Sequence, residues 1–225
     1  MSESTQNANA ASPSAWRLTL HSQQLVPGSE MTFDHGTSVV FLNDGKVIVR
    51  EDGEEAVAHQ NAEAWVQRSP SSLVGGGTAA SIDWWTLSPA DGHFTENGNV
   101  LLAREIRIDA ATCLLRCDQV EFPPGGIAYL HTHAGPGIRR LRSGALQVQT
   151  SGESHEYVPG DSWFEPGPVP VYAEASPEAG AAFLRVMVLP VAFKGKSSIT
   201  YVREEDRVKP KDQRYTIFLD EETTL

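Results

Sequence analysis

The sequence predicts an all-β protein made of two similar barrels in tandem. Three observations support this prediction. The composition is rich in residues that form turns, strand-like segments recur where helical patterns are scarce, and the two halves of the chain repeat at an offset of 99 residues. A chain of 225 residues is long enough for two compact domains, each with its own hydrophobic core.

The composition excludes several classes of protein and partner. Hydrophobic residues make up 40% of the chain, which is too high for a disordered protein, and 19 Gly and 14 Pro favour short strands joined by turns. The 18 Lys and Arg against 29 Asp and Glu give a net charge of −11, which repels nucleic-acid phosphates and anionic membrane surfaces. We therefore expect no nucleic-acid or membrane partner, and any anionic ligand needs a local cationic pocket.

Targeting signals and cysteines indicate the compartment. Residues 1–15 have neither the basic start nor the apolar centre of a secretion signal, so we interpret them as a disordered lead-in and expect a cytoplasmic protein. The best apolar stretch, residues 181–193, is interrupted by Arg185 and Pro190 and is too short to span a bilayer. Cys113 and Cys117 would lie about 13 Å apart on one strand, too far for a disulfide, which favours small buried thiols in a reducing compartment.

Strand-like segments follow one another along the whole chain. They are mostly four to eight residues long, and Gly, Pro, Asn or Asp clusters separate them, which is typical of an all-β sandwich or barrel. The predicted strands are residues 16–20, 38–42, 46–50, 64–67, 82–87, 101–108, 113–122, 127–133, 138–141, 145–149, 162–165, 169–173 and 182–189.

The internal repeat divides the chain. Its matched pairs are Gly45 with Gly144, Val49 with Val148, Gly53 with Gly152, Glu54 with Glu153, and Asn61 with Gly160. The run 64–66 then aligns with the run 163–165. We predict a first barrel over residues 16–95, a second over 100–193, and a charged tail over 194–225.

The charged tail holds two strand-like pieces, residues 199–202 and 215–219. They either complete a sheet or pair with another subunit. Exposed strand edges favour pairing between chains, so we expect a homo-oligomer, most simply a homodimer.

Two motifs in the second half resemble those of the cupin family. The stretch G-G-I-A-Y-L-H-T-H-A-G-P-G-I-R-R-L-R-S-G is similar to the first motif, G(x)5HxH(x)3-4E(x)6G, with Gly125, His131, His133 and Gly144 in register. The later stretch around W-F-E-P-G-P resembles the second motif, in which Gly160 and Pro166 match and Pro168 stands where glycine is usual. Together with the repeat, the resemblance implies a bicupin, that is, two jelly-roll (double-stranded β-helix) barrels in tandem.

The histidine pair predicts a metal site in the C-terminal barrel. His131 and His133 are two residues apart on a strand, so both imidazoles face the same side and can reach one divalent transition metal such as Zn, Fe, Ni or Mn. The family's Glu falls at Gly137 and its second-motif His at Val171, so two usual ligands are missing. Glu165 is the candidate to complete the shell; the alternative is a glutamate at the rim or facing outward.

Arg139 is the candidate for binding an anionic substrate. Counting in steps of two from position 137 places its guanidinium on the inward face of the barrel, where its planar fork suits a carboxylate. The alternatives are a salt bridge with an internal Glu or an arginine in solvent. Arg140 and Arg142 fall on the opposite face and are most simply solvated.

Two aromatic residues complete the predicted substrate site. Tyr129 shares the parity of the histidine pair and could line the same cavity, although an aromatic inside a barrel is also plain core. Trp163 shares a face with Glu165, so the two side chains enter or leave the cavity together.

The first half shows no comparable set. The positions of the histidine pair correspond to Thr32 and Asp34, so we predict a structural barrel that packs on the second barrel or on a partner through Trp65, Trp84 and Trp85.

The function prediction follows from the second barrel. We expect it to bind a small, anionic organic molecule, with the resemblance implying a metal-dependent dioxygenase, isomerase or lyase. The alternative is a non-catalytic cupin, a small-molecule sensor or structural dimer with a relic metal site. The sequence assigns no catalytic residue.

Overall fold

A computed structural model describes residues 14–51, 54–92 and 98–225. Residues 1–13 of the predicted lead-in therefore lie outside the described residues. Every long element in the described ranges is a β-strand, as the sequence predicts, and the other elements are two short 3-10 turns, Val191–Phe193 and Glu204–Asp206. No helix of the described chain is long and apolar enough to cross a membrane.

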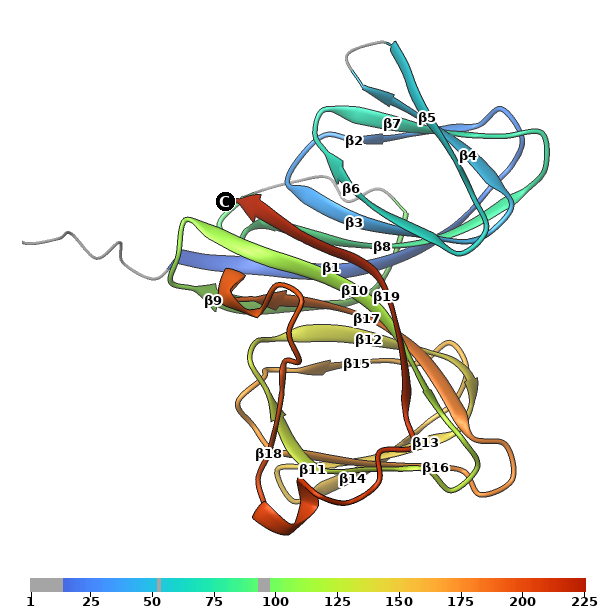
Figure 1. Ribbon diagram of the computed structural model, residues 1–225. Helices are drawn as coiled ribbons and strands as arrows, with labels where there is room; N and C mark the ends of the chain where they lie inside the picture. The colour runs from blue at the N-terminus through green and yellow to red at the C-terminus, as the bar shows by residue number, and fades with distance from the viewer. Residues whose placement is uncertain (1–13, 52–53, 93–97) are drawn as a thin grey trace, which may run out of the picture.

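The first half forms a barrel from two antiparallel sheets (Figure 1). Its larger sheet has the order β6-β3-β8-β1-β9, and its smaller sheet has the order β2-β7-β4-β5. The strands are β1 (Ser14–Leu25), β2 (Glu30–Phe33), β3 (Thr37–Asp44), β4 (Lys46–Glu51), β5 (Glu54–Gln60), β6 (Glu63–Arg68), β7 (Ser71–Gly75), β8 (Ala80–Pro89) and β9 (Asn99–Ile108).

The second half repeats this arrangement. Its sheets have the orders β15-β12-β17-β10-β19 and β14-β13-β16-β11-β18, so the first eight strands of each half take equivalent places. The strands are β10 (Thr112–Phe122), β11 (Ile127–His133), β12 (Gly137–Gly144), β13 (Leu146–Thr150), β14 (Glu153–Tyr157), β15 (Ser162–Glu165), β16 (Val171–Ala175), β17 (Ala181–Leu189), β18 (Ile199–Tyr201) and β19 (Arg214–Thr224). The topology confirms two jelly-roll barrels in tandem.

The sequence misses several short strands of the outer sheets. Strands β2, β5, β7 and β14 were not predicted. In β14, the first four side chains are exposed, so the strand lacks the alternation of apolar and polar residues that identifies a half-buried strand. Pairing with β13 holds it in place instead.

The segment after each barrel returns to the edge of its large sheet. Strand β9, which the sequence assigned to the second barrel, pairs with β1 of the first. Strand β19 pairs with β10, and β18 pairs with β11, so the charged tail completes both sheets of the second barrel. The sequence did not assign these pairings, because a strand carries no local signal of a partner that lies far away in the chain.

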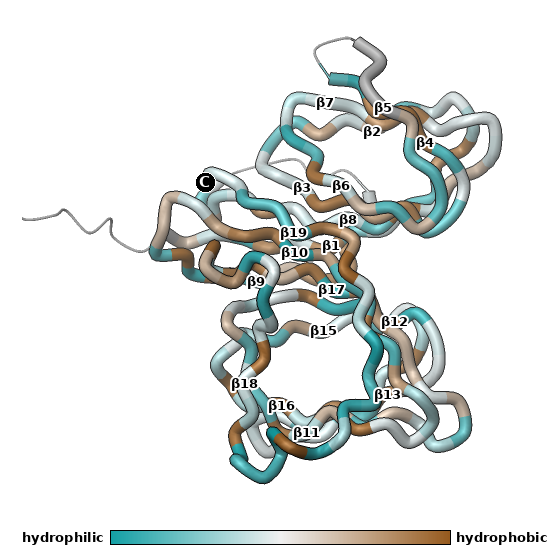
Figure 2. The backbone as a smooth tube through the Cα atoms, in the orientation of Figure 1, coloured by the Kyte–Doolittle hydropathy of each residue, from teal (hydrophilic) through white to brown (hydrophobic). Residues whose placement is uncertain are grey.

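The two large sheets pack face to face and share one hydrophobic core (Figure 1). The core includes Leu20 and Trp85 from the first half and Leu115 and Val186 from the second. Figure 2 shows hydrophobic residues along the strands where the halves meet. Trp85 also donates a hydrogen bond from its Nε1 to the carbonyl oxygen of Ile138, 3.1 Å away. This contact crosses between the barrels, so Trp85 packs on the second barrel, one of the two partners that the sequence left open.

The other two tryptophans that the sequence predicted at the packing surface lie elsewhere. Trp65 and Trp84 belong to the interior core of the first barrel and not to the shared core.

Cys113 and Cys117 are free and buried in the shared core, as the sequence predicts. Arg140 and Arg142 are not simply solvated: Arg140 forms an ion pair with the buried Asp83 of the first barrel, and Arg142 donates to Asn43.

Candidate functional site

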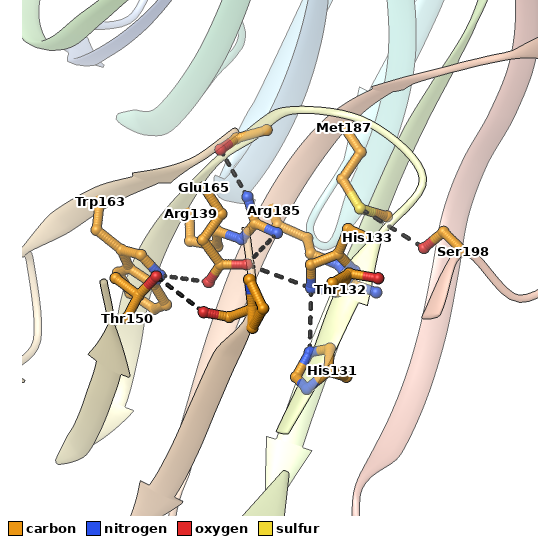
Figure 3. Close-up of polar contacts among 12 residues, drawn as sticks. His131, Thr132, His133, Arg139, Thr150, Trp163, Glu165, Arg185, Met187 and Ser198 are labelled. Atoms are coloured by element: carbon orange, nitrogen blue, oxygen red, sulfur yellow. Dashed lines mark hydrogen bonds and ion pairs between the residues drawn. The ribbon is translucent and has the colours of Figure 1, made fainter. Parts of the chain in front are cut away.

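The histidine pair lies at the end of β11 and points into the second barrel (Figure 3). His131 and His133 are buried, and their Nε2 atoms are 3.2 Å apart. The Nδ1 atom of His131 lies 2.7 Å from the carbonyl oxygen of Tyr129, so a neutral His131 carries its proton on Nδ1 and turns the lone pair of Nε2 inward.

Glu165 extends the pair from the neighbouring sheet. Strand β15 places Glu165 opposite Gly137 of β12, and the carboxylate enters the barrel with 8% of the residue exposed. Its Oε2 atom lies 3.2 Å from Nε2 of His133, and its Oε1 atom accepts a hydrogen bond of 2.9 Å from Nε1 of Trp163. Of the two interpretations from the sequence, the inward one describes the structure, and Trp163 enters the barrel with Glu165.

Arg139 is fully buried and takes Glu165 as its partner. Its Nη2 atom lies 2.7 Å from Oε2 of Glu165, and its Nη1 atom donates to the carbonyl oxygen of Gly137 at 2.6 Å. The salt bridge with an internal Glu is therefore the arrangement found. We call His131, His133, Arg139 and Glu165 the buried polar cluster.

A second ion pair lies beside this cluster. Arg185 of β17 stands opposite Arg139 across the sheet. Its Nε and Nη2 atoms donate to the two carboxylate oxygens of Asp118, at 2.6 Å and 3.0 Å. The two arginines are therefore each paired with one acid, as buried charges require.

Burial controls the protonation of the cluster. It lowers the pKa of His133 to about 3, although Glu165 opposes the shift, and it also lowers the pKa of His131. Burial alone would raise the pKa of Glu165, but the Arg139 guanidinium and His133 outweigh it and hold that pKa well below its usual value. At neutral pH the cluster therefore contains neutral imidazoles, a carboxylate and a guanidinium, and its net charge is zero.

The space inside the second barrel is small. A cavity of about 20 Å³ is lined by the buried polar cluster and by apolar side chains such as Val171 and Phe183. This volume holds about one water molecule. An organic ligand does not fit beside the histidine pair.

A larger cavity of about 380 Å³ lies between the barrel and its C-terminal segment, and we call it the outer cavity. Arg185, Ile199 and Tyr215 line both cavities. The charged residues that line the outer cavity are Arg116, Asp118, Arg185, Lys196 and Lys211. Its walls also include Tyr201, Tyr215 and Ile217.

The cationic residues of the outer cavity are held in place by backbone and acid partners. Arg116 pairs with Asp220 at 2.8 Å and donates to the carbonyl oxygens of Phe193 and Lys196. Lys211 donates to the carbonyl oxygen of Lys209 at 2.7 Å, and its Nζ atom lies 4.3 Å from the ring centre of Tyr201. The sequence did not point to these residues, because strands from four parts of the chain bring them together. The one signal in the sequence is Arg185, a charged residue within the otherwise apolar run of residues 181–189.

Tyr129 does not line the inner cavity. The prediction from its parity with His131 and His133 was wrong. The pairing of β11 with β16 shifts register between Ala128 and His131, and such an irregularity breaks the alternation of faces. Ala128 lines the cavity instead. The ring of Tyr129 lies under Lys209 and Lys211, whose Nζ atoms are 4.6 Å and 5.3 Å from its centre.

The buried polar cluster does not fit a divalent metal ion. In the part of the chain that the structure describes, no group of three or more His, Cys, Asp and Glu side chains is arranged to hold one. Arg139 already neutralises Glu165, and Val171, which faces His131 across the strands, is apolar. A Cβ atom at Gly137 would lie 2.5 Å from the carbonyl oxygen of Val186, so no side chain fits there without a backbone shift. The metal site at His131, His133 and Glu165 stays a prediction from the sequence.

No protein-family model matches this chain, and no curated protein matches it either.

Solved structures show the fold. An oxalate decarboxylase deletion mutant from Bacillus subtilis matches with a TM-score of 0.61 and 12% identity, covering 86% of this chain and 73% of the other. A salicylate 1,2-dioxygenase from Pseudaminobacter salicylatoxidans matches with a TM-score of 0.52 and 13% identity, covering 91% and 75%. The protein YhaK from Escherichia coli has a TM-score of 0.52 and 14% identity, covering 76% and 84%. The chain has the cupin fold in a two-barrel arrangement.

Proposed function

We propose that this bicupin binds a small organic anion in the outer cavity of its C-terminal barrel. The observation that carries the proposal is the sign of the lining charges. Four cationic side chains and one acidic side chain line this cavity, in a chain whose net charge is −11. The pairs Arg185–Asp118 and Arg116–Asp220 are neutral, so the excess positive charge at the cavity comes from Lys196 and Lys211. A local concentration of cations against the overall field attracts an anion.

The size of the cavity supports a small molecule. Ligand pockets have volumes of about 300–1,000 Å³, and the outer cavity has about 380 Å³. The inner cavity has about 20 Å³, so the ligand binds outside the buried polar cluster and not beside His131 and His133.

The chemistry of the walls selects an anion with an apolar body. Asp118 uses the Nε and Nη2 atoms of Arg185, which leaves Nη1 outside that pair. Burial raises the pKa of Tyr201 and of Tyr215, so both phenols stay protonated at neutral pH and can donate to an anion. The Tyr rings and Ile217 offer apolar contact to the rest of the ligand.

A carboxylate is the ligand class that best matches these groups, because arginine binds carboxylates through its planar fork. The names of two proteins of similar fold, oxalate decarboxylase and salicylate 1,2-dioxygenase, refer to small carboxylates, and one dioxygenase structure contains gentisate. A metal-dependent dioxygenase, isomerase or lyase would need an ion that the buried polar cluster does not fit. Ligand binding is therefore the function proposed.

Calorimetric titration with a matched pair of probes tests the proposal. Benzoate and benzamide have the same ring, but only benzoate is charged. We expect benzoate to bind at least about 10-fold more tightly, since hydrogen bonds to charged groups contribute roughly 1.5–3 kcal/mol. Equal affinities, or no binding of benzoate, salicylate or oxalate, would contradict the proposal.

A pair of lysine variants then locates the site. Lys211→Gln removes a cation from the outer cavity and should weaken benzoate binding by about 10-fold. Lys194→Gln is the control, because Lys194 is exposed, pairs with Glu222 and does not line the cavity. A similar loss in both variants would show that general charge, and not the cavity, governs binding.

A further inference from the structure

The donor atoms of the buried polar cluster lie close together. Nε2 of His131 is 3.2 Å from Nε2 of His133, which is 3.2 Å from Oε2 of Glu165 (Figure 3). Two ligand atoms of one ion, each about 2.1 Å from it, are about 3.0–3.4 Å apart in octahedral or tetrahedral geometry. Both of these separations fall within this range.

The chemistry of the donors is also suitable. The hydrogen bond from Nδ1 of His131 to the carbonyl oxygen of Tyr129 turns the Nε2 lone pair of His131 inward. The Oε2 atom of Glu165 has no partner in hydrogen-bond geometry, although it lies 2.7 Å from Arg139. Neutral imidazole and carboxylate are ligands that Zn and Ni accept.

The charge of Arg139 is what opposes a cation. The guanidinium is fully buried and contacts the same Glu165 oxygen that a metal would use. A divalent ion bound to that oxygen would stand a few ångströms from a positive charge in a medium of low dielectric constant, where repulsion is strong. Arg139 and Glu165 together are neutral, as are Arg185 and Asp118, so an added ion would bring an uncompensated charge of two into the barrel.

We propose that Arg139 acts as a built-in cation that excludes divalent metals from His131, His133 and Glu165, and that removal of its charge converts these three residues into a transition-metal site. The inference concerns the inner cavity and is independent of anion binding in the outer cavity. The Arg139 guanidinium takes the place of a metal ion's positive charge and holds the Glu165 carboxylate within the barrel.

Metal titration of single-site variants tests this proposal. Arg139→Met removes the charge and keeps an unbranched side chain, and Arg139→Gln keeps hydrogen-bonding groups for Gly137 and Glu165. Starting from chelator-treated protein, we expect each variant to bind one equivalent of Zn²⁺ or Ni²⁺ at least about 100-fold more tightly than the unaltered chain. Arg140→Met is the matched control, because Arg140 is the next residue on the strand and pairs with Asp83 outside the barrel; its metal affinity should not change.

Double variants identify the ligands. Adding Glu165→Gln or His131→Ala to Arg139→Gln should remove the gained affinity, and Zn²⁺ should raise the melting temperature of Arg139→Gln but not of the doubles. Stoichiometric Zn²⁺ or Ni²⁺ binding by the unaltered chain at neutral pH would overturn the proposal, whether or not the variants fold. So would folded Arg139→Met and Arg139→Gln proteins that gain no metal. None of these results changes the benzoate titration, so failure here and failure of the proposed function are distinguishable.

Discussion

The interiors of the two barrels differ at equivalent positions of the same frame. In the second barrel, Arg139 lies opposite Trp163 on one side and Arg185 on the other. In the first barrel, Val40 takes the same place, opposite Trp65 and Trp84. An apolar residue thus stands where the second barrel has a buried cation, and a tryptophan stands where it has Arg185.

Glu165 and the neighbouring Asp118 also have counterparts in the first barrel. Gln67 lies opposite Ser38, as Glu165 lies opposite Gly137, and each accepts a hydrogen bond from a tryptophan two residues earlier. His21 faces Trp84 and stacks on it with ring centres 4.8 Å apart, whereas its counterpart Asp118 pairs with Arg185. Both barrels therefore share the tryptophan and its hydrogen-bond acceptor. The second barrel adds the ion pairs Arg139–Glu165 and Arg185–Asp118.

The two barrels fill the same architecture with different kinds of interior side chain. The first barrel closes its interior with stacked and apolar side chains, which need no charge compensation. The second barrel buries charges that must stay paired, because each unpaired charge is costly in a low-dielectric interior.

The largest effect should come from breaking the buried ion pair. Glu165→Gln copies the first barrel but leaves Arg139 unpaired, and we expect the free energy of unfolding to fall by about 3–5 kcal/mol. The double variant Glu165→Gln with Arg139→Val copies both first-barrel residues and should recover most of that loss. Denaturant unfolding measures both. A double variant as unstable as the single one would show that the pairing is not what stabilises the site.

A smaller effect is expected at Gly137, where the two barrels differ in side-chain space. Its counterpart Ser38 carries a buried side chain that hydrogen-bonds Thr86, whereas a Cβ at Gly137 would lie 2.5 Å from the carbonyl oxygen of Val186. Gly137→Ala should therefore lower the free energy of unfolding by about 1–3 kcal/mol. Ser38→Gly is the comparison variant, which adds no steric conflict. Unfolding of Gly137→Ala at the same denaturant concentration as the unaltered chain would contradict the expectation.

Acid should weaken both barrels through their histidines. Burial, aided by His35, lowers the pKa of His21 to about 4, and burial lowers that of His133 to about 3. As the pH falls below the unfolded value of about 6.5, the unfolded chain takes up these protons and the folded chain does not, so stability falls. Each residue should contribute a loss of about 1.2 kcal/mol between pH 7 and pH 5.5. Glu165, whose pKa is lowered, adds a loss only below its own unfolded value.

Paired variants separate the two contributions. His21→Gln and His133→Gln should each flatten the dependence of unfolding free energy on pH, because each removes one proton-binding group of the unfolded chain. Unchanged slopes in both variants would place the acid sensitivity elsewhere.

The smallest effect concerns association. Strands β5 and β14 are equivalent terminal strands of the two outer sheets, and such edges can pair between chains. Self-association, most simply as a dimer, stays a prediction, and light scattering measures it. A single species near 24.5 kDa at all concentrations would argue against it.

The fold class and part of the buried polar cluster follow from the sequence, whereas the outer cavity does not. Alternation along a strand placed His131 and His133 on one inward face, and it tied Trp163 to Glu165, because side chains on a strand have a period of two. The repeat predicted equivalent strands in both halves. Its constant offset does not hold throughout, since Trp65 corresponds to Trp163 at an offset of 98 and not 99. The connections before these strands also differ in length, with two residues between β5 and β6 and four between β14 and β15.

Which side chains contact one another depends on the tertiary structure. The register shift in β11 turned Tyr129 away from the cavity, and the return of β9 to the first barrel depends on a strand partner about eighty residues earlier. The pairing of Arg139 with Glu165 joins two strands, and the outer cavity joins β10, β17, β18 and β19. The period of a strand is a local property that a sequence displays. The choice of partner strand, and hence of the charge that faces a buried arginine, depends on the free energy of the whole folded chain.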